Sequence, residues 1–175
     1  MFAVSELPAE VNVGGGRYRL VRVFKHDFWA ATCFYEAIGR ATLLRIVCKF
    51  GRAQPFCGLP LAPLGRWARA HEAAIYRALA GVAGVPRWVG PFGETGYAIE
   101  YLAAAPLDHL PAPPPGFFDR LRTLFDAVHA RGVAYADANK RSNILVFPDG
   151  RPGRIDFQIA IRRRDDWPLP LRALV

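Results

Sequence analysis

Residues 132–161, which read GVAYADANKRSNILVFPDGRPGRIDFQIAI, decide how this chain can fold. Residues 144–147 form a short apolar run of β-prone side chains, a Pro-Asp-Gly-Arg-Pro turn follows, and a second short strand is entered at Arg154. This pattern predicts a β-hairpin. Asn143 immediately precedes the first strand and Asp156 immediately follows the second. Antiparallel pairing would therefore bring these two side chains to the same end of the hairpin.

The polar side chains at this end of the hairpin suit a particular chemistry. Carboxylate and amide oxygens are ligands for Mg²⁺, which binds few protein groups and leaves room for waters and phosphates. Asp137 lies on the loop before Asn143, where it could accept the proton of a hydroxyl group. A proton acceptor beside a metal-bound phosphate is the arrangement used in phosphoryl transfer. The alternative interpretation of the same residues is an ordinary hairpin with a polar loop.

Asp137, Asn143 and the pair Asp156-Phe157 resemble the catalytic loop and the metal-binding motif of the protein-kinase-like superfamily, H-R-D-x-x-x-x-N and D-F-G. The chain is similar to the small bacterial branch, which includes lipopolysaccharide (Kdo/heptose) kinases, RIO-type kinases and aminoglycoside phosphotransferases. The resemblance implies a phosphotransferase that uses ATP and Mg²⁺. It implies that Asp137 accepts or orients the proton of the acceptor hydroxyl and that Asn143 and Asp156 hold Mg²⁺. Lys140 would reach the transferred phosphate.

The chain also departs from the kinase motifs. Tyr-Ala replaces His-Arg before Asp137, and the interval from Asp137 to Asn143 is one residue longer than in the family. Gln158 stands where the family has glycine, and residues 24–32 contain no glycine although a phosphate-covering Gly-rich turn is expected there. These differences favour a second interpretation, a catalytically inactive pseudokinase or nucleotide-binding interaction module.

Other matches to the family lie upstream. Lys49 ends an alternating apolar run, and Glu72 lies in a predicted helix at residues 66–80. Taken alone, a lysine at a strand end is usually a solvated charge, and two interpretations stay open for Glu72: a partner of Lys49, or a surface charge that pairs with nearby arginines. The resemblance implies that they form an ion pair and that Lys49 holds the nucleotide phosphates. It also implies a hinge at Glu100 and Leu102, whose backbone carbonyl and amide would meet the adenine.

The predicted fold class is α+β, a protein-kinase-like two-lobe fold. The first lobe is expected to hold a five-stranded-type antiparallel sheet with one helix, and the second to be reduced. The predicted organisation is an N-terminal tail at 1–17, a kinase-like N-lobe at 18–102, a hinge and Pro-rich connection at 103–116, and a truncated C-lobe with the catalytic loop and the metal-binding hairpin at 117–175.

Composition limits the partners. The net charge of +8 and the pI near 9.9 imply an acidic partner, such as nucleotide phosphates, an anionic sugar or lipid, or nucleic acid. No recognition motif supports nucleic acid. The hydroxyl acceptor is expected to be a sugar or lipopolysaccharide component or a protein Ser/Thr. Peripheral contact with an anionic surface is a further interpretation of the charge.

The remaining signals concern location. Three cysteines without metal-ligand spacing indicate a reducing compartment. No secretory signal and no apolar run long enough to cross a membrane is visible, so a cytoplasmic location is predicted.

Residues 56–64 form a Pro-broken apolar loop, and two interpretations stay open for it: core packing, or an exposed patch that meets a partner or a lipid surface.

Overall fold

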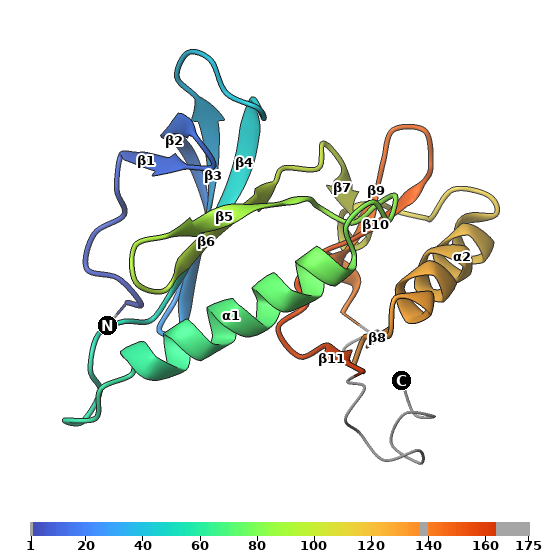
Figure 1. Ribbon diagram of the computed structural model, residues 1–175. Coiled ribbons are helices and arrows are strands. Elements are labelled where there is room, and N and C mark those ends of the chain that lie inside the picture. The colour runs from blue at the N-terminus through green and yellow to red at the C-terminus, as the bar shows by residue number, and fades with distance from the viewer. Residues whose placement is uncertain (1, 137–139, 164–175) are drawn as a thin grey trace. The chain divides into compact units, whose positions relative to one another are not determined.

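The computed structural model describes residues 2–136 and 140–163 (Figure 1). The chain divides into two compact units. Unit 1 comprises the residues up to Ala73 together with Trp88–Tyr101, and unit 2 comprises Ala74–Arg87 and the residues from Leu102 onward. The boundary between the units falls inside one helix, α1 (Ala62–Ala78).

Unit 1 contains an antiparallel sheet whose strands follow the order β1-β2-β3-β4-β6-β5. The strands are β1 (Glu10–Val13), β2 (Gly16–His26), β3 (Ala30–Ala37), β4 (Arg45–Gly51), β5 (Trp88–Phe92) and β6 (Gly96–Glu100). The antiparallel sheet is confirmed, but it has six strands and not the predicted five. The added strand, β1, lies in the segment predicted as a tail. It pairs with β2 through a turn at Gly14 and Gly15, which both have positive φ, a Gly-Gly hairpin signal.

Alternation along β3 and β4 gives the sheet two different faces. Cys33 and Tyr35 on β3, with Ile46 and Cys48 on β4, are fully buried in one apolar core, which also contains Val11 and Val13 of β1. The residues between them, such as Phe34, Val47 and Lys49, point to the other face, because successive side chains of a strand alternate. This second face is less buried.

The core position of two cysteines predicts their reactivity. Burial raises the pKa of the Cys33 thiol to about 11 and also raises the pKa of the Cys48 thiol, whereas Cys57 is exposed. The thiolate is the reactive form, so Cys57 is expected to react with Ellman's reagent at neutral pH while the other two react only after denaturation. Counting released chromophore before and after adding guanidinium tests this. Immediate reaction of all three thiols in the native protein would contradict it.

Within its described residues, unit 2 contains the long helix α2 and several short elements. They are β7 (Ala105–Pro106), a 3₁₀ turn (Leu107–His109), α2 (Phe117–Ala130), β8 (Val133–Ala134), a second 3₁₀ turn (Arg141–Asn143), β9 (Ile144–Val146), β10 (Pro152–Arg154) and β11 (Ile161–Arg162). Figure 1 shows the β9–β10 hairpin and α2. In the described part of the chain, no helix has both the length and the apolar composition needed to cross a membrane.

The β9–β10 hairpin is antiparallel, with Ile144 opposite Arg154. Its second strand is fixed by the chain that follows α1, because the Arg154 amide donates to the Gly84 carbonyl at 2.8 Å. A side chain at Gly84 would place a Cβ 2.6 Å from the Pro152 carbonyl oxygen, and the φ of Gly84 is +88°, so only glycine fits this close approach. The backbone of β10 is therefore held in place by the segment that contains Gly84.

Candidate functional site

The first group of candidate residues lies in unit 1. Lys49, near the end of β4, is held by Glu72 of α1: Lys49 Nζ lies 3.2 Å from Glu72 Oε1. The two side chains are only 14% and 2% exposed, so this pair is not a solvated surface contact. Lys49 Nζ also lies 5.8 Å from the centre of the Tyr97 ring. A mostly buried lysine fixed by a buried carboxylate presents its charge at one defined position.

Next to Lys49, the same face of the sheet carries aromatic side chains that sequence reasoning missed. The ring centres of Phe34 and Tyr101 are 4.5 Å apart, and those of Phe24 and Phe34 are 6.3 Å apart. Phe34 lies opposite Val47, two residues from Lys49 along β4. The alternation of β3 was the available signal, since it places Phe34 on the Lys49 face. These half-exposed rings offer an apolar surface on which a planar base could stack.

The predicted hinge falls at the end of this sheet. Glu100 is the last residue of β6 and lies opposite Ile46. The Tyr101 amide donates to the Arg45 carbonyl at 3.2 Å, which continues the pairing by one residue. Leu102 is the first residue of the unit 2 segment that follows. The structure therefore places Glu100 and Leu102 on either side of the point where the chain leaves unit 1.

The second group lies in unit 2, at one end of the β9–β10 hairpin. Asn143 and Asp156 flank the paired strands, and the Ile155 amide donates to the Asn143 carbonyl at 3.1 Å. Lys140 Nζ lies 3.9 Å from Asp156 Oδ2. Asp156 has a φ of +64°, a conformation that non-glycine residues rarely adopt. Asp137 lies outside the described residues.

Tyr135 connects the two candidate metal ligands. Its hydroxyl donates to the Asp156 carbonyl at 2.6 Å and accepts from Asn143 Nδ2 at 3.3 Å. Burial raises the pKa of this hydroxyl, which keeps it a donor at neutral pH. Its ring packs edge-on against Phe157, with centres 5.3 Å apart. From the sequence, Tyr135 was only a departure from the family histidine; in the structure it holds Asp156 and Asn143 together.

A buried arginine packs against the ring of Tyr135. Arg154 is 0% exposed, and its guanidinium carbon lies 3.7 Å from the centre of the Tyr135 ring. A desolvated guanidinium over an aromatic face is a favourable cation–π arrangement. Sequence reasoning missed Arg154, because an arginine in a short β strand is ordinarily solvated.

The donor set of the second group fits a hard cation. Asp156 supplies a carboxylate and Asn143 an amide, and Mg²⁺ commonly takes one or two such ligands while keeping waters and phosphate oxygens. Among residues 2–136 and 140–163, no cluster of three or more His, Cys, Asp or Glu side chains is present.

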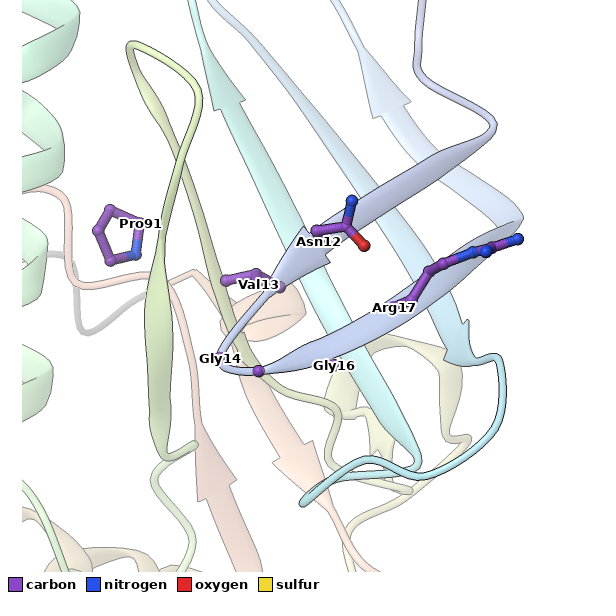
Figure 2. Close-up of a pocket in the computed structure, with 7 residues that line it drawn as sticks. Asn12, Val13, Gly14, Gly16, Arg17 and Pro91 are labelled. Atoms are coloured by element: carbon purple, nitrogen blue, oxygen red, sulfur yellow. The ribbon is translucent and has the colours of Figure 1, made fainter.

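A separate hollow of about 480 Å³ lies at the β1–β2 turn of unit 1 (Figure 2). It is lined by Asn12, Val13, Gly14, Gly15, Gly16, Arg17 and Pro91. A Cβ at Gly14 would approach Val89 to 2.6 Å, so the turn requires glycine there. Arg17 is paired with Glu10 at 2.8 Å. None of the predicted site residues that the structure describes lines this hollow.

Comparison with known proteins supports the fold. No protein-family model and no curated protein matches the chain. Among solved structures, the chain is similar to the crystal structure of a Rio2 kinase–ADP/Mg²⁺–phosphoaspartate complex from Chaetomium thermophilum, with a TM-score of 0.60 and 18% sequence identity. The similarity covers 84% of this chain and 49% of that one, so the chain spans about half of the Rio2 kinase chain. The fold is therefore protein-kinase-like.

Proposed function

We propose that this chain is an ATP- and Mg²⁺-dependent phosphotransferase that acts on a hydroxyl group. The observation that carries the proposal is the pairing of Lys49 with the buried Glu72 in a protein-kinase-like fold. Phosphoryl transfer depends on positioned charges more than on covalent chemistry, and a lysine fixed by a buried carboxylate is such a charge. The matched solved structure was obtained with ADP and Mg²⁺, which agrees with this choice of cofactors.

In unit 1, Lys49 would contact the phosphate oxygens of the nucleotide. The aromatic surface of Phe34 and Tyr101 would receive the adenine ring, next to the backbone of Glu100 at the end of β6, and Leu102 follows as the first residue beyond unit 1. Stacking on aromatic rings accepts any planar base, so this surface contributes affinity more than selectivity. Backbone groups at the hinge would supply the hydrogen bonds that select adenine.

In unit 2, Asn143 and Asp156 would hold Mg²⁺, which neutralises charge on the phosphates during transfer. The acceptor hydroxyl oxygen forms a bond to the γ-phosphorus, the bond from that phosphorus to the ADP oxygen breaks, and Asp137 receives the hydroxyl proton. Lys140 would contact the transferred group. The basic charge of the chain favours an anionic acceptor, a sugar or lipid of the lipopolysaccharide type, over a neutral one. A protein Ser/Thr residue is the alternative acceptor. The reaction is proposed to take place in the cytoplasm.

One observation favours the pseudokinase alternative. Asp27 Oδ1 accepts hydrogen bonds from the Trp29 and Ala30 amides in the β2–β3 turn, both at 2.9 Å. These backbone amides stand where a Gly-rich loop would cover phosphates, and here a carboxylate already occupies them. The nucleotide would then be held without that contact, which lowers the capacity for turnover.

Isothermal titration calorimetry of ATP binding, with and without Mg²⁺, combined with a transfer assay, distinguishes an active phosphotransferase from a pseudokinase. The test variant is Asp156→Asn, because asparagine tolerates the positive φ of this position while alanine would add strain. Mg²⁺-dependent binding that weakens in the variant supports the site. The same binding without transfer to any hydroxyl acceptor indicates a pseudokinase. If neither protein binds nucleotide under either condition, the proposed function is wrong.

Exchange of Glu72 for glutamine tests the role of the ion pair in nucleotide binding. The amide keeps the shape and a hydrogen-bond acceptor for Lys49 but removes the charge that fixes it. We expect the affinity for MgATP to fall about tenfold, the loss of one charge-assisted hydrogen bond. Titration of Glu72→Gln beside Glu94→Gln is the matched comparison, since Glu94 pairs with Arg66 at the surface. Equal affinity of both variants for MgATP would show that Glu72 has no role in nucleotide binding.

A further inference from the structure

Large apolar side chains are exposed together at the end of unit 1 where α1 begins. They come from the N-terminal segment, the β2–β3 turn, the loop after β4 and the first turns of α1. We call this group the apolar cap: Phe2, Trp29, Phe56, Leu59, Leu64 and Trp67. Trp29, Leu59 and Trp67 are 61%, 66% and 62% exposed. Groups of large apolar side chains at a surface mark contact sites more often than single ones do.

The centre of the apolar cap is a tight turn. The Phe56 and Leu59 backbones exchange both hydrogen bonds, at 3.0 and 2.9 Å, and Cys57 and Gly58 between them have positive φ. Residues 55–60 are all exposed, and residues 53–65 contain no charged side chain. In Figure 1 the loop between β4 and α1 projects away from the sheet. The turn therefore presents Phe56 and Leu59 to solvent on a defined backbone.

A buried arginine fixes the base of this turn. Arg52 is 3% exposed, and its guanidinium donates to the carbonyls of Phe28, Gln54, Phe2 and Pro55 at 2.9, 3.2, 3.3 and 3.4 Å. The Arg52 guanidinium carbon also lies 4.0 Å from the centre of the Phe28 ring. One buried cation thus joins three of the segments that carry the cap. These segments are therefore held by defined hydrogen bonds, although the side chains of the cap are exposed.

Ring contacts connect two members of the cap. The Phe28 ring lies between them, with its centre 4.8 Å from that of Trp29 and 5.0 Å from that of Phe56. On α1, Trp67 stacks on His71 at 5.4 Å, which holds its indole on the outer surface of the helix. The cap is thus a protruding aromatic and aliphatic surface.

We propose that the apolar cap inserts into the interfacial layer of an anionic phospholipid bilayer. Trp, Phe and Leu side chains on a projecting turn suit that layer, where an apolar body enters the acyl boundary and the indole N–H stays at the headgroups. Lys25, Arg66 and Arg69 lie in the segments around the cap. Two of them are paired with Asp27 and Glu94, so most of the attraction to anionic lipid comes from the net charge of +8. The inference does not depend on nucleotide binding.

Vesicle flotation tests this inference with the full chain. One set of vesicles is phosphatidylcholine alone, and the other contains phosphatidylcholine and phosphatidylglycerol in a ratio of about 7 to 3. The test variant carries Phe56→Ser and Leu59→Ser. The matched control is Leu44→Ser, which removes a 71% exposed leucine of the same unit that lies outside the cap. We expect the wild type and Leu44→Ser to float with the anionic vesicles and the double variant to bind them at least about tenfold more weakly.

The other outcomes contradict the inference. No flotation of the wild type overturns it, and so does equal flotation of the double variant, which would mean that basic residues alone attract the lipid. Sedimentation velocity without lipid is run in parallel. A dimer that dissociates in the double variant would show that a second copy of the chain covers the cap and not a bilayer. Circular dichroism confirms that the exposed substitutions leave the fold intact, so a loss of binding is not a loss of structure.

Discussion

Replacing Lys49 with methionine is expected to lower MgATP-dependent phosphotransfer by a factor of about 100 or more and to destabilise the protein by about 3 kcal/mol. The first effect follows if Lys49 holds the nucleotide phosphates, as proposed. The second follows from geometry alone, because Glu72 is 2% exposed and would keep a buried carboxylate without the ammonium that lies 3.2 Å away. Activity assays and urea denaturation measure the two effects separately.

The double variant Lys49→Met/Glu72→Leu separates these two effects. Replacing both members of a buried pair with apolar side chains removes the unpaired charge, so much of the lost stability should return. Activity should not return with it. A single variant as stable as the wild type would show that water reaches Glu72 and that the pair is not buried in solution. Restored activity in the double variant would show that Lys49 has no role in transfer.

Replacing Arg52 with methionine is expected to reduce the free energy of unfolding by about 3 to 5 kcal/mol. Methionine fills much of the space but donates no hydrogen bond, so the four carbonyls that the guanidinium contacts lose that donor. Arg52→Lys should recover only part of the loss, since one ammonium cannot reach carbonyls arranged around a planar fork. Urea titration of both variants gives the two values.

Arg69→Met is the control for this second prediction. Arg69 also donates to a carbonyl, that of Gly93 at 3.2 Å, but from the surface. Its replacement should change the stability by less than about 1 kcal/mol. Similar losses in Arg52→Met and Arg69→Met would indicate that the Arg52 network opens readily to water. The role given to Arg52 in fixing the apolar cap would then also be wrong.

Several features of the fold could be predicted from local patterns. The alternating run that ends at Lys49 and the helix signal at residues 66–80 predict β4 and α1, although α1 begins four residues earlier than predicted. The hairpin with Asn143 and Asp156 at its ends follows from two apolar runs and a turn. Strand β1 was not predicted, because four residues with two buried valines carry too weak a periodicity. Its Gly-Gly turn was the stronger signal.

The contacts inside the candidate site were harder to predict from the sequence. The Lys49–Glu72 contact was predicted from the resemblance, and the structure places the two side chains together. Tyr135 and Arg154 were not assigned a role, since their contact joins two segments nineteen positions apart through a ring face. Such a contact leaves no local pattern. Whether residues 56–64 pack inside or are exposed was also open, and the structure shows residues 56–60 exposed.

The irregular pairing of β2 has a consequence for handling the protein at high concentration. Strand β1 covers β2 only from Gly16 to Arg19, and the pairing of β2 with β3 is interrupted near Val21 and Phe24. These two side chains are exposed on the part of β2 that β1 does not cover, where a straight backbone would offer a template for another molecule. The bulges twist that strand and neighbouring arginines repel a second copy. Deleting Val21 removes one of the two bulges and should therefore promote fibril-like aggregation.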